Sequence, residues 1–321
     1  MRSVLMTPGA ARFDRELIGA LQCPADGGDL RAAAEALRCA ACDARYPVAD
    51  GVVRFVDAGR LGDEDRREQA ARDAESAWYD SMFEGYTNAV EIPTMLARIW
   101  RPTGLVLDHG AGTGRLTERL AAAGVPVIAV DYSAESLRKL VARTRGSRVL
   151  AVQADVRALP LRNGVVSAAV SCELHEHIRG RDERVRALRE LARVMPPGAP
   201  LAISSFNYNL AFRLWALKGN RGAREGEHLL GQDFYYVRQT RREFAGEVSE
   251  AFRIEELVGI RNIPARSVAG LIRRARVPRA ADRFMDWMVA SGWRLDVALE
   301  RTPVSALTGL FWLAKAVRPS S

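Results

Sequence analysis

The stretch GLVLDHGAGTGRLTERLAAAGVPVIAVD, residues 104–131, decides the fold of this chain. It begins with a short apolar run (104–108), passes through three glycines spaced two residues apart, and then shows the apolar spacing of a helix (115–124) that ends at a glycine. A second apolar run (126–131) follows directly. A strand, a glycine loop, a helix and a second strand in this order indicate a right-handed crossover between strands of a parallel sheet.

The same alternation continues on the C-terminal side of this stretch. Ser133 can cap a helix that stops near Gly146, and Asp182 can cap another helix whose apolar positions share one face. Further apolar runs predict strands at residues 148–155, 165–172, 200–206, 252–260 and 308–317. We therefore predict an α/β fold in which a Rossmann-like, doubly wound sheet of seven strands carries helices on both faces.

Composition and charge limit the class of protein. The chain has 321 residues, of which 48% are hydrophobic and 27% are charged, and this excludes a disordered or fibrous chain. The formal net charge of +8 is compatible with a nucleic-acid partner. We attribute the charge to composition bias instead, because Lys139, Lys218 and Lys315 are the only lysines among 47 basic residues.

The chain shows no targeting or membrane-spanning signal. No apolar run reaches the roughly 18 residues that a transmembrane helix needs. The first 21 residues have no uninterrupted apolar core of signal-peptide length. We therefore expect a cytoplasmic protein without a transmembrane segment.

The glycine loop lies where open α/β sheets bind ligands, at the carboxyl end of the first predicted strand. Its sequence is Asp108-His109-Gly110-Ala111-Gly112-Thr113-Gly114. Position 115 is arginine, where a dinucleotide-binding fingerprint requires glycine, and no Lys-Ser or Lys-Thr pair follows. The loop therefore disfavours NAD, FAD and a phosphate-binding P-loop.

Carboxylates end the next two predicted strands as well. Asp131 can accept hydrogen bonds from both hydroxyls of a ribose, and Asp155 can accept one from an adenine amino group. Three strand ends with an aspartate at each predict a crevice for an adenosine moiety. Both residues can alternatively be plain strand-end residues.

With these features, residues 104–206 resemble a class I S-adenosylmethionine-dependent methyltransferase of the type 11 kind. The segments SAAVSCELHEHI (167–178) and RALRELARVMPPGAPLAISSF (186–206) extend the resemblance. It implies S-adenosylmethionine as the cofactor and a methyl-transferring enzyme. Carried over position by position, it implies cofactor contacts from Asp108, Gly110, Ala111, Gly112, Gly114, Asp131, Tyr132, Asp155, Val156, Cys172 and Tyr86.

Aromatic residues just ahead of this region also resemble a family feature. Trp78, Tyr79 and Tyr86 match in kind the residues that cover the cofactor in many members. Aromatic residues at helical spacing can equally be plain packing residues.

A cysteine cluster near the N-terminus has the spacing of a zinc ribbon. Two short knuckles, Cys23-Pro-Ala-Asp26 and Cys39-Ala-Ala-Cys42, are twelve residues apart. The segment resembles a Trm112-like zinc ribbon, and the run Tyr-Pro-Val-Ala-Asp-Gly-Val (46–52) adds to the match. Three thiolates and a carboxylate can complete a tetrahedral structural Zn²⁺ site. The alternative, raised by Asp26, is a metal-free ribbon held by packing alone.

The segment after the fourth predicted strand of the core carries the candidates for catalysis. His175, Glu176 and His177 would lie beside the methyl group, where a base can remove the proton of the acceptor. The spacing Glu173-x-x-Glu176-His177 also resembles the divalent-metal segment of ubiquinone-biosynthesis O-methyltransferases. A purely structural role for these residues is the third alternative.

We expect three parts along the chain: a zinc-ribbon-like domain (1–60), a helical cap or linker (61–100), and a methyltransferase core (101–321) with an insertion near 262–305. The insertion can be a substrate lid, a homodimer face, a membrane-surface helix, or a helix packed on the core. Phe234, Tyr235 and Tyr236 are expected to wall a substrate pocket, and His228 is a further candidate base.

The predicted function is methyl transfer to oxygen or nitrogen of a small-molecule metabolite. The first alternative is an rRNA or tRNA base methyltransferase guided by the ribbon, which the net charge of +8 motivates. The second alternative is a scaffold that binds the cofactor without chemistry. Family resemblance supports the reaction class and leaves the acceptor open.

Overall fold

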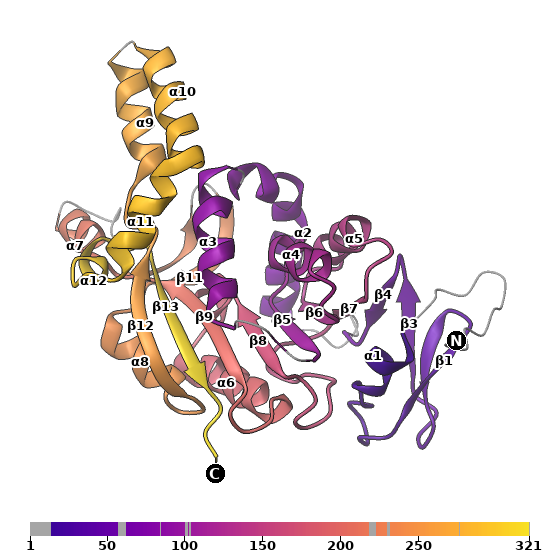
Figure 1. The fold of residues 1–321 in the computed structure, drawn as a ribbon. Coiled ribbons are helices and arrows are strands. Elements are labelled where there is room, and N and C mark those ends of the chain that lie inside the picture. The colour runs from indigo at the N-terminus through magenta and orange to yellow at the C-terminus, as the bar shows by residue number, and fades with distance from the viewer. Residues whose placement is uncertain are drawn as a thin grey trace.

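A computed structural model describes most of the chain. The described residues are 14–56, 62–83, 85–99, 102, 104–217, 223–229, 232–275 and 277–320. They form a mixed sheet with helices on both faces and a helical hairpin that projects from the body (Figure 1).

The centre of the sheet has the doubly wound arrangement that the sequence predicts. The parallel strands are β5 (Val106–His109), β6 (Val127–Asp131), β7 (Val149–Gln153), β8 (Ala168–Ser171) and β9 (Pro200–Phe206). They lie in the order β7-β6-β5-β8-β9, so the strand order reverses at β5. Ligands of open α/β sheets bind at such a switch point.

The two late strands close one edge of the sheet as an antiparallel hairpin. β13 (Phe311–Val317) pairs antiparallel with both β9 and β12 (Arg253–Ile260). This confirms the two late strands. β13 begins later than the predicted run because α12 (Ser305–Thr308) takes up the preceding residues.

The N-terminal strands extend the same sheet, which the sequence does not predict. β4 (Val52–Arg54) pairs parallel with β7, and β3 (Arg45–Ala49), β2 (Ala36–Cys39) and β1 (Leu30–Ala33) follow it outward as antiparallel neighbours. The sheet of the described residues therefore has eleven strands. The predicted division into three parts remains a prediction.

Side chains of the cysteine-containing segment also share a core with the central sheet. Leu17 and Ile18 of α1 (Arg15–Gly19), together with Leu21, belong to the same buried cluster as Val152 and Leu161. Leu21 forms an isolated bridge with Leu161. The segment is thus packed on the sheet as well as hydrogen-bonded to its edge.

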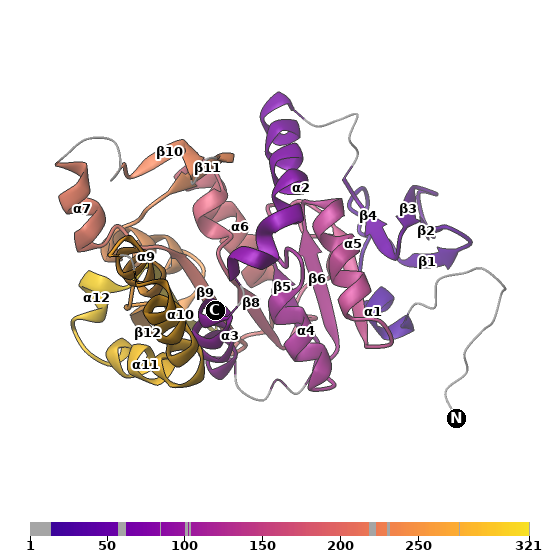
Figure 2. The same ribbon diagram turned by 90° about the horizontal axis from the view of Figure 1, so that it is seen from above.

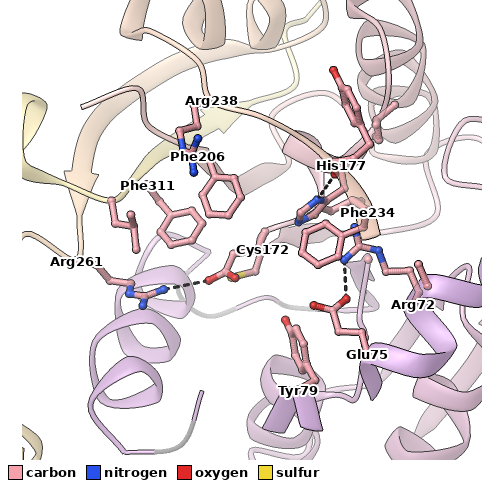
Figure 3. Close-up of a pocket in the computed structure, with 18 of the residues that line it drawn as sticks. Arg72, Glu75, Tyr79, Cys172, His177, Phe206, Phe234, Arg238, Arg261 and Phe311 are labelled. Carbon is pink, nitrogen blue, oxygen red and sulfur yellow. Dashed lines mark hydrogen bonds and ion pairs between the residues drawn. The ribbon is translucent and has the colours of Figure 1, made fainter. Parts of the chain in front are cut away.

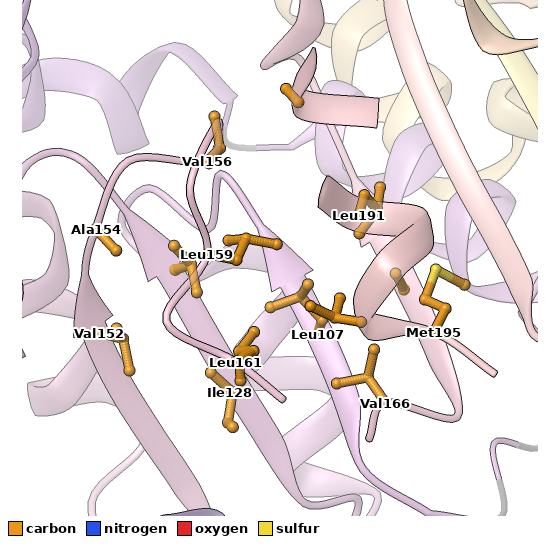
Figure 4. Close-up of a cluster of buried hydrophobic side chains, with 14 of the residues drawn as sticks. Leu107, Ile128, Val152, Ala154, Val156, Leu159, Leu161, Val166, Leu191 and Met195 are labelled. Carbon is orange, nitrogen blue, oxygen red and sulfur yellow. The ribbon is translucent and has the colours of Figure 1, made fainter. Parts of the chain in front are cut away.

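Alternating residues of the central strands face two separate layers of helices. Leu107, Ile128 and Val152 point into a cluster that includes α6 (Arg181–Val194) and α8 (Arg241–Val248) (Figure 4). Their neighbours along the strands pack against α3 (Tyr86–Ala97), α4 (Arg115–Ala122) and α5 (Ala134–Arg143). A period of two in strands buried on both faces produces this division.

Helix starts follow the predicted capping in one case and differ in another. Ser133 Oγ accepts a hydrogen bond from the Ser136 N–H at 3.0 Å and caps α5 as predicted. The predicted cap Asp182 was wrong, because the chain already turns into α6 at Gly180, which has a φ of 79°. Asp182 lies in the first turn, where a carboxylate still interacts favourably with the helix dipole.

The remaining elements lie around the sheet. They are α2 (Asp63–Phe83), α7 (Leu210–Ala216), the hairpin β10 (Glu225–Leu229) and β11 (Gln232–Val237), and α9 (Ala265–Arg274), α10 (Pro278–Trp287) and α11 (Trp293–Glu300). A π-helical turn (Met288–Gly292) joins α10 to α11. None of the described helices combines the length and apolar character needed to cross a bilayer.

Candidate functional site

A cavity of about 1820 Å³ opens at the carboxyl ends of the parallel strands. Its walls come from the glycine loop, the segments after β6, β7 and β8, helix α2, and the elements around β9, β11 and β13. Figure 2 shows α2 between α5 and β11, and α2 contacts both of these elements. The candidate site therefore has the sheet on one side and α2 on another.

Asp131 fixes the glycine loop at one wall of this cavity. Its carboxylate accepts the Gly112 N–H and the Ser133 N–H, each at 2.8 Å. Burial raises the pKa of Asp131, and the backbone hydrogen bonds act against that rise. Gly110 and Gly112 have φ values of 80° and 52°, a conformation that favours glycine.

The structure brings most of the predicted cofactor residues to one cavity. The cavity wall includes Tyr86, Gly110, Gly112, Asp131, Tyr132, Asp155, Val156 and Cys172. Asp108, Ala111 and Gly114 do not line it. Asp108 instead accepts the Thr117 hydroxyl at 2.5 Å, and burial raises the pKa of Asp108 to about 6. Gly114 packs on α5, because a Cβ there would approach Leu140 to 2.7 Å.

The carboxylate of Asp155 already has a basic partner. Arg157 Nη2 lies 2.7 Å from Asp155 Oδ2, and the Arg157 N–H donates to Asp155 Oδ1 at 2.8 Å. Both residues line the cavity. An adenine amino group would share this carboxylate with Arg157.

The part of the cavity lined by Gly110, Gly112, Asp131 and Tyr132 is called the cofactor wall, after the predicted role of these residues. Helix α2 is attached to it by two carboxylates that were not among the predicted site residues. Asp73 accepts the Ser133 hydroxyl at 2.5 Å, and Asp80 accepts the Thr113 hydroxyl at 2.6 Å. The two aspartates are seven residues apart and share one face of α2. This spacing is the feature of the sequence from which their common role could have been predicted. They hold α2 across the ends of β5 and β6.

Of the three aromatic residues predicted to cover the cofactor, two line the cavity. Tyr79 lines it, and the guanidinium of Arg115 lies 5.5 Å from the Tyr79 ring centroid. Tyr86 lines it as well and donates its hydroxyl to Asp296. The side chain of Trp78 lies outside the described part of the chain.

The three predicted catalytic residues occupy a 3-10 turn (His175–His177), and their side chains differ in surroundings. His175 is 2% exposed, and its Nε2 lies 2.8 Å from Glu247, which also binds Arg184. Glu176 is 0% exposed, and burial raises its pKa to about 8. Neither residue lines the cavity.

His177 is the member of this turn that lines the cavity. Its Nδ1 lies 2.8 Å from the Tyr235 carbonyl oxygen, which can only accept, so Nδ1 carries the hydrogen and Nε2 keeps its lone pair. Burial, followed by the charge of Arg72, lowers the pKa of His177 well below its usual range. His177 is therefore a neutral acceptor at the cavity wall.

Glu173 also lines the cavity, within a cluster of buried charges. Its carboxylate lies 3.6 Å from Arg261 and 3.9 Å from Arg115. Glu91 pairs with the same two arginines at 2.7 Å and 3.1 Å. Burial, followed by the charge of Glu91, raises the pKa of Glu173.

The predicted divalent-metal set is not brought together in the described residues. Two groups of acidic, thiol or imidazole side chains have all ligand atoms within 4.8 Å of one another, and neither contains Glu176 or His177. One group is Glu91, Cys172 and Glu173, where Arg115 and Arg261 already lie within ion-pair distance of both acidic side chains.

The second group is the set predicted for zinc: Cys23, Asp26, Cys39 and Cys42. Cys23 Sγ lies 3.7 Å from Cys42 Sγ, and Cys39 Sγ lies 3.4 Å from Asp26 Oδ1. The backbone N–H groups of Ala41 and Cys42 point at Cys39 Sγ at 3.4 and 3.5 Å. These donors suit a thiolate, so the donor set fits a tetrahedral Zn²⁺.

The half of the cavity away from the glycine loop has an aromatic wall. Phe206 and Phe311 stack with ring centroids 4.9 Å apart, and His177 lies edge-on to Phe206 at 5.9 Å. Phe234 and Tyr235 line the cavity as predicted, whereas Tyr236 is buried behind the wall. Figure 3 shows Phe206 and Phe311 on one side of the cavity, with Arg72, Glu75 and Tyr79 on the other. The side chain of His228 lies outside the described part of the chain.

Comparison with known proteins identifies the domain that contains the cofactor wall. A family model described as a methyltransferase domain matches residues 106–198. The chain is 29% identical over 147 residues to the demethylmenaquinone methyltransferase of Renibacterium salmoninarum, a match that covers 42% of this chain and 60% of that protein. It is 33% identical over 103 residues to "Probable tRNA methyltransferase 9B" of Bos taurus, covering 32% of this chain and 21% of that protein.

These curated relatives are matched over only part of their length, between about a fifth and three fifths. A solved structure of the cyclase SpnF superposes with a TM-score of 0.55 at 18% identity, over 80% of this chain and 97% of that chain. That likeness establishes the fold. Residues 106–198 therefore form a methyltransferase domain within a Rossmann-like fold.

The tautomer and charge of His177 can be measured directly. We expect His177 to stay neutral at pH values where an ordinary histidine is already charged, with its hydrogen on Nδ1, because the ring is buried and Tyr235 accepts that hydrogen. Long-range ¹H–¹⁵N NMR spectra of ¹⁵N-histidine-labelled protein report both properties, and the chain has only four histidines. His177→Gln assigns the signals, and a ring that ionises at the ordinary histidine pKa would contradict the arrangement.

Glu176 should make stability depend on pH. Its pKa in the folded protein is about 8, whereas an unfolded glutamate has a pKa of about 4.3. Its stabilising contribution is complete below the unfolded value and is lost as pH rises through the folded value. The unfolding free energy of the wild type should therefore fall relative to Glu176→Gln between about pH 4 and pH 8, by at most about 1.4 kcal/mol per pH unit.

Urea unfolding at pH 5, 6.5 and 8 measures this difference. Glu118→Gln is the matched control, because Glu118 is exposed on α4. If Glu176→Gln and Glu118→Gln follow the same pH dependence as the wild type, Glu176 is not a buried neutral acid.

Proposed function

We propose that the chain is an S-adenosylmethionine-dependent methyltransferase that methylates oxygen or nitrogen of a small-molecule metabolite. One observation carries the proposal: a single cavity joins the glycine loop and Asp131 to an aromatic wall that contains His177. The family match over residues 106–198 supports the reaction class.

The residues at the cofactor wall fit S-adenosylmethionine. Gly110 and Gly112 would follow its methionine part, Asp131 would hold the ribose hydroxyls, and Tyr132 and Asp155 would meet the adenine. The fit rests on backbone that approaches the cavity without side chains and on a carboxylate that the loop itself holds in place. When bound, this cofactor supplies an electrophilic methyl group on a sulfonium sulfur.

The chain's own residues would position the acceptor and take up its proton. An oxygen or nitrogen acceptor of that methyl group would have to give up a proton to a base of the protein. Nε2 of His177 has the free lone pair for it, because Nδ1 is committed to Tyr235. His175 is instead held by Glu247, away from the cavity wall.

The size of the cavity leaves room for an acceptor beside the cofactor, and its lining suits a small one. Its 1820 Å³ exceeds the volume of about 300–1,000 Å³ that is usual for one small-molecule pocket. The volume beyond the cofactor wall is lined by Phe206, Phe311 and Phe234, which suits an apolar or aromatic body.

A tRNA or rRNA acceptor is the second candidate. The match to "Probable tRNA methyltransferase 9B" of Bos taurus motivates it. Helix α2 lines the cavity, so a base in RNA would have to be extruded from its strand to reach the proposed site. RNA binding that weakens steeply with salt would favour the second candidate.

We also propose that Cys23, Asp26, Cys39 and Cys42 hold a structural Zn²⁺. Tyr46 supports the site from outside, because its hydroxyl lies 3.0 Å from Cys23 Sγ and can donate to a thiolate. With four protein ligands the ion would keep no open position, so its role would be to fix β1 to β3 at the edge of the sheet.

Cofactor binding is the first test of the function. Isothermal titration should give micromolar binding of S-adenosylmethionine and no binding of NAD. Asp131→Ala should weaken binding at least tenfold, because it removes the ribose acceptor and frees the glycine loop. Asp182→Ala is the control, since that side chain is 99% exposed. Equal affinity of the wild type and Asp131→Ala would refute the assigned cofactor wall.

Metal content tests the ribbon. We expect about one zinc per chain in the wild type and in the control Cys172→Ser, and loss of zinc in Cys39→Ser. Asp26→Cys should retain the metal, because it restores a fourth thiolate. Elemental analysis measures the content, and thermal unfolding with a chelator measures its effect on stability. A metal-free wild type whose Tm a chelator leaves unchanged would show that packing alone holds the ribbon.

A further inference from the structure

We propose that Arg238 binds an acidic group of the acceptor, a carboxylate or a phosphate, and that the acceptor is therefore an anion with an apolar or aromatic body. The proposal rests on the proposed function, since it takes the part of the cavity beyond the cofactor wall as the acceptor site.

Arg238 is a buried cation without an acidic partner. It follows β11, is 5% exposed and lines the cavity. No carboxylate of the described residues lies within ion-pair distance of it, and its Nε has no hydrogen-bond partner there. Burial lowers the pKa of Arg238, as expected for a cation that lacks a counter-ion.

The contacts that Arg238 does make leave its charge uncompensated. Nη1 donates to the Ala223 carbonyl, and the guanidinium lies 4.0 Å from the Phe212 ring centroid and 4.6 Å from that of Tyr236. Cation–π contacts offset only part of the cost of removing a guanidinium from water. The fork of a guanidinium matches a carboxylate or phosphate, so an anionic ligand would complete this site.

The other buried or half-buried arginines of the cavity wall differ from Arg238, because each has a carboxylate within ion-pair distance. Arg72 pairs with Glu75, Arg157 with Asp155, and Arg261 with Glu91. Arg179, which is exposed, pairs with Glu227. Arg67, which also lines the cavity, is exposed to solvent. Pairing is thus the rule along this wall, and Arg238 is left for a partner from outside the chain.

Aromatic side chains connect Arg238 to the proposed proton acceptor. Arg238 lies on Tyr236, Tyr236 lies edge-on to Phe206 at 6.5 Å, and Phe206 lies edge-on to His177 at 5.9 Å. Figure 3 shows Arg238, Phe206 and Phe311 on the same side of the cavity. An acceptor that reaches both ends would place its acidic group at Arg238, its body along Phe206, and its nucleophile at His177.

Matched small probes test the anion site. We would titrate the protein with 2-naphthoate, 2-naphthyl phosphate and the neutral 2-naphthamide, and separately with S-adenosylmethionine. At least one anion should bind the wild type ten times more tightly than the amide, and the tighter anion identifies the acidic group. Arg238→Gln should abolish that preference, and Arg238→Lys should keep a reduced preference. Arg67→Gln is the matched control at the cavity rim and should behave as the wild type.

Several outcomes would overturn the proposal. They are equal binding of the amide and the anions to the wild type, no binding of either anion at millimolar concentration, or a preference that survives in Arg238→Gln. The comparison of anion and amide binding to the wild type tests the proposal even if a variant fails to fold. S-adenosylmethionine should bind Arg238→Gln within twofold of the wild type. A wild type that prefers anions but does not bind S-adenosylmethionine would keep the anion site and overturn the proposed function.

Discussion

The two hydrogen bonds that Asp131 accepts hold the glycine-loop side of the cavity together. One comes from Gly112 in the loop after β5, and the other from Ser133 at the start of α5. The parallel register of β5 and β6 places the end of β6 beside that loop, and the N–H groups of Gly110 and Ala111 donate to the Val130 carbonyl. The loop is therefore shaped by the neighbouring strand before any ligand binds, and the cavity wall is preformed.

Helix α2 and the buried charges depend on this preformed loop. Asp80 of α2 accepts from Thr113 inside the loop, and Arg115, at the start of the next helix, extends to Glu91 and Glu173. Together with Arg261 these residues make a buried cluster in which Glu91 and Glu173 each lie within ion-pair distance of both Arg115 and Arg261. The cluster connects the glycine loop to the segment after β12 through ion pairs. The two halves of the cavity are therefore joined by these contacts.

The local sequence pattern was enough to predict the central strands and the glycine loop. The apolar runs of β5 to β9 and the glycines between β5 and α4 are signals within a few residues. β4 has only three residues, and its pairing with β7 joins segments about a hundred residues apart, which no local pattern encodes. The sequence likewise could not distinguish His177 from His175, because only tertiary packing decides which side chain of a 3-10 turn faces a cavity. The sequence could not distinguish Arg238 from the other arginines of the chain. Its lack of an acidic partner depends on which side chains the fold brings next to it.

The family match covers the glycine loop and stops short of the wall that would contact the acceptor. The match ends at residue 198, and it contains the glycine loop, Asp131 and His177. The wall that would meet the acceptor is built from Phe206, Phe234, Arg238 and Phe311, all of which follow that residue. A shared cofactor domain therefore carries information about methyl transfer and little about the molecule that receives the methyl group. The chemistry of the acceptor has to be inferred from the side chains that this wall leaves unsatisfied, and the unpaired guanidinium of Arg238 is the strongest such feature on it.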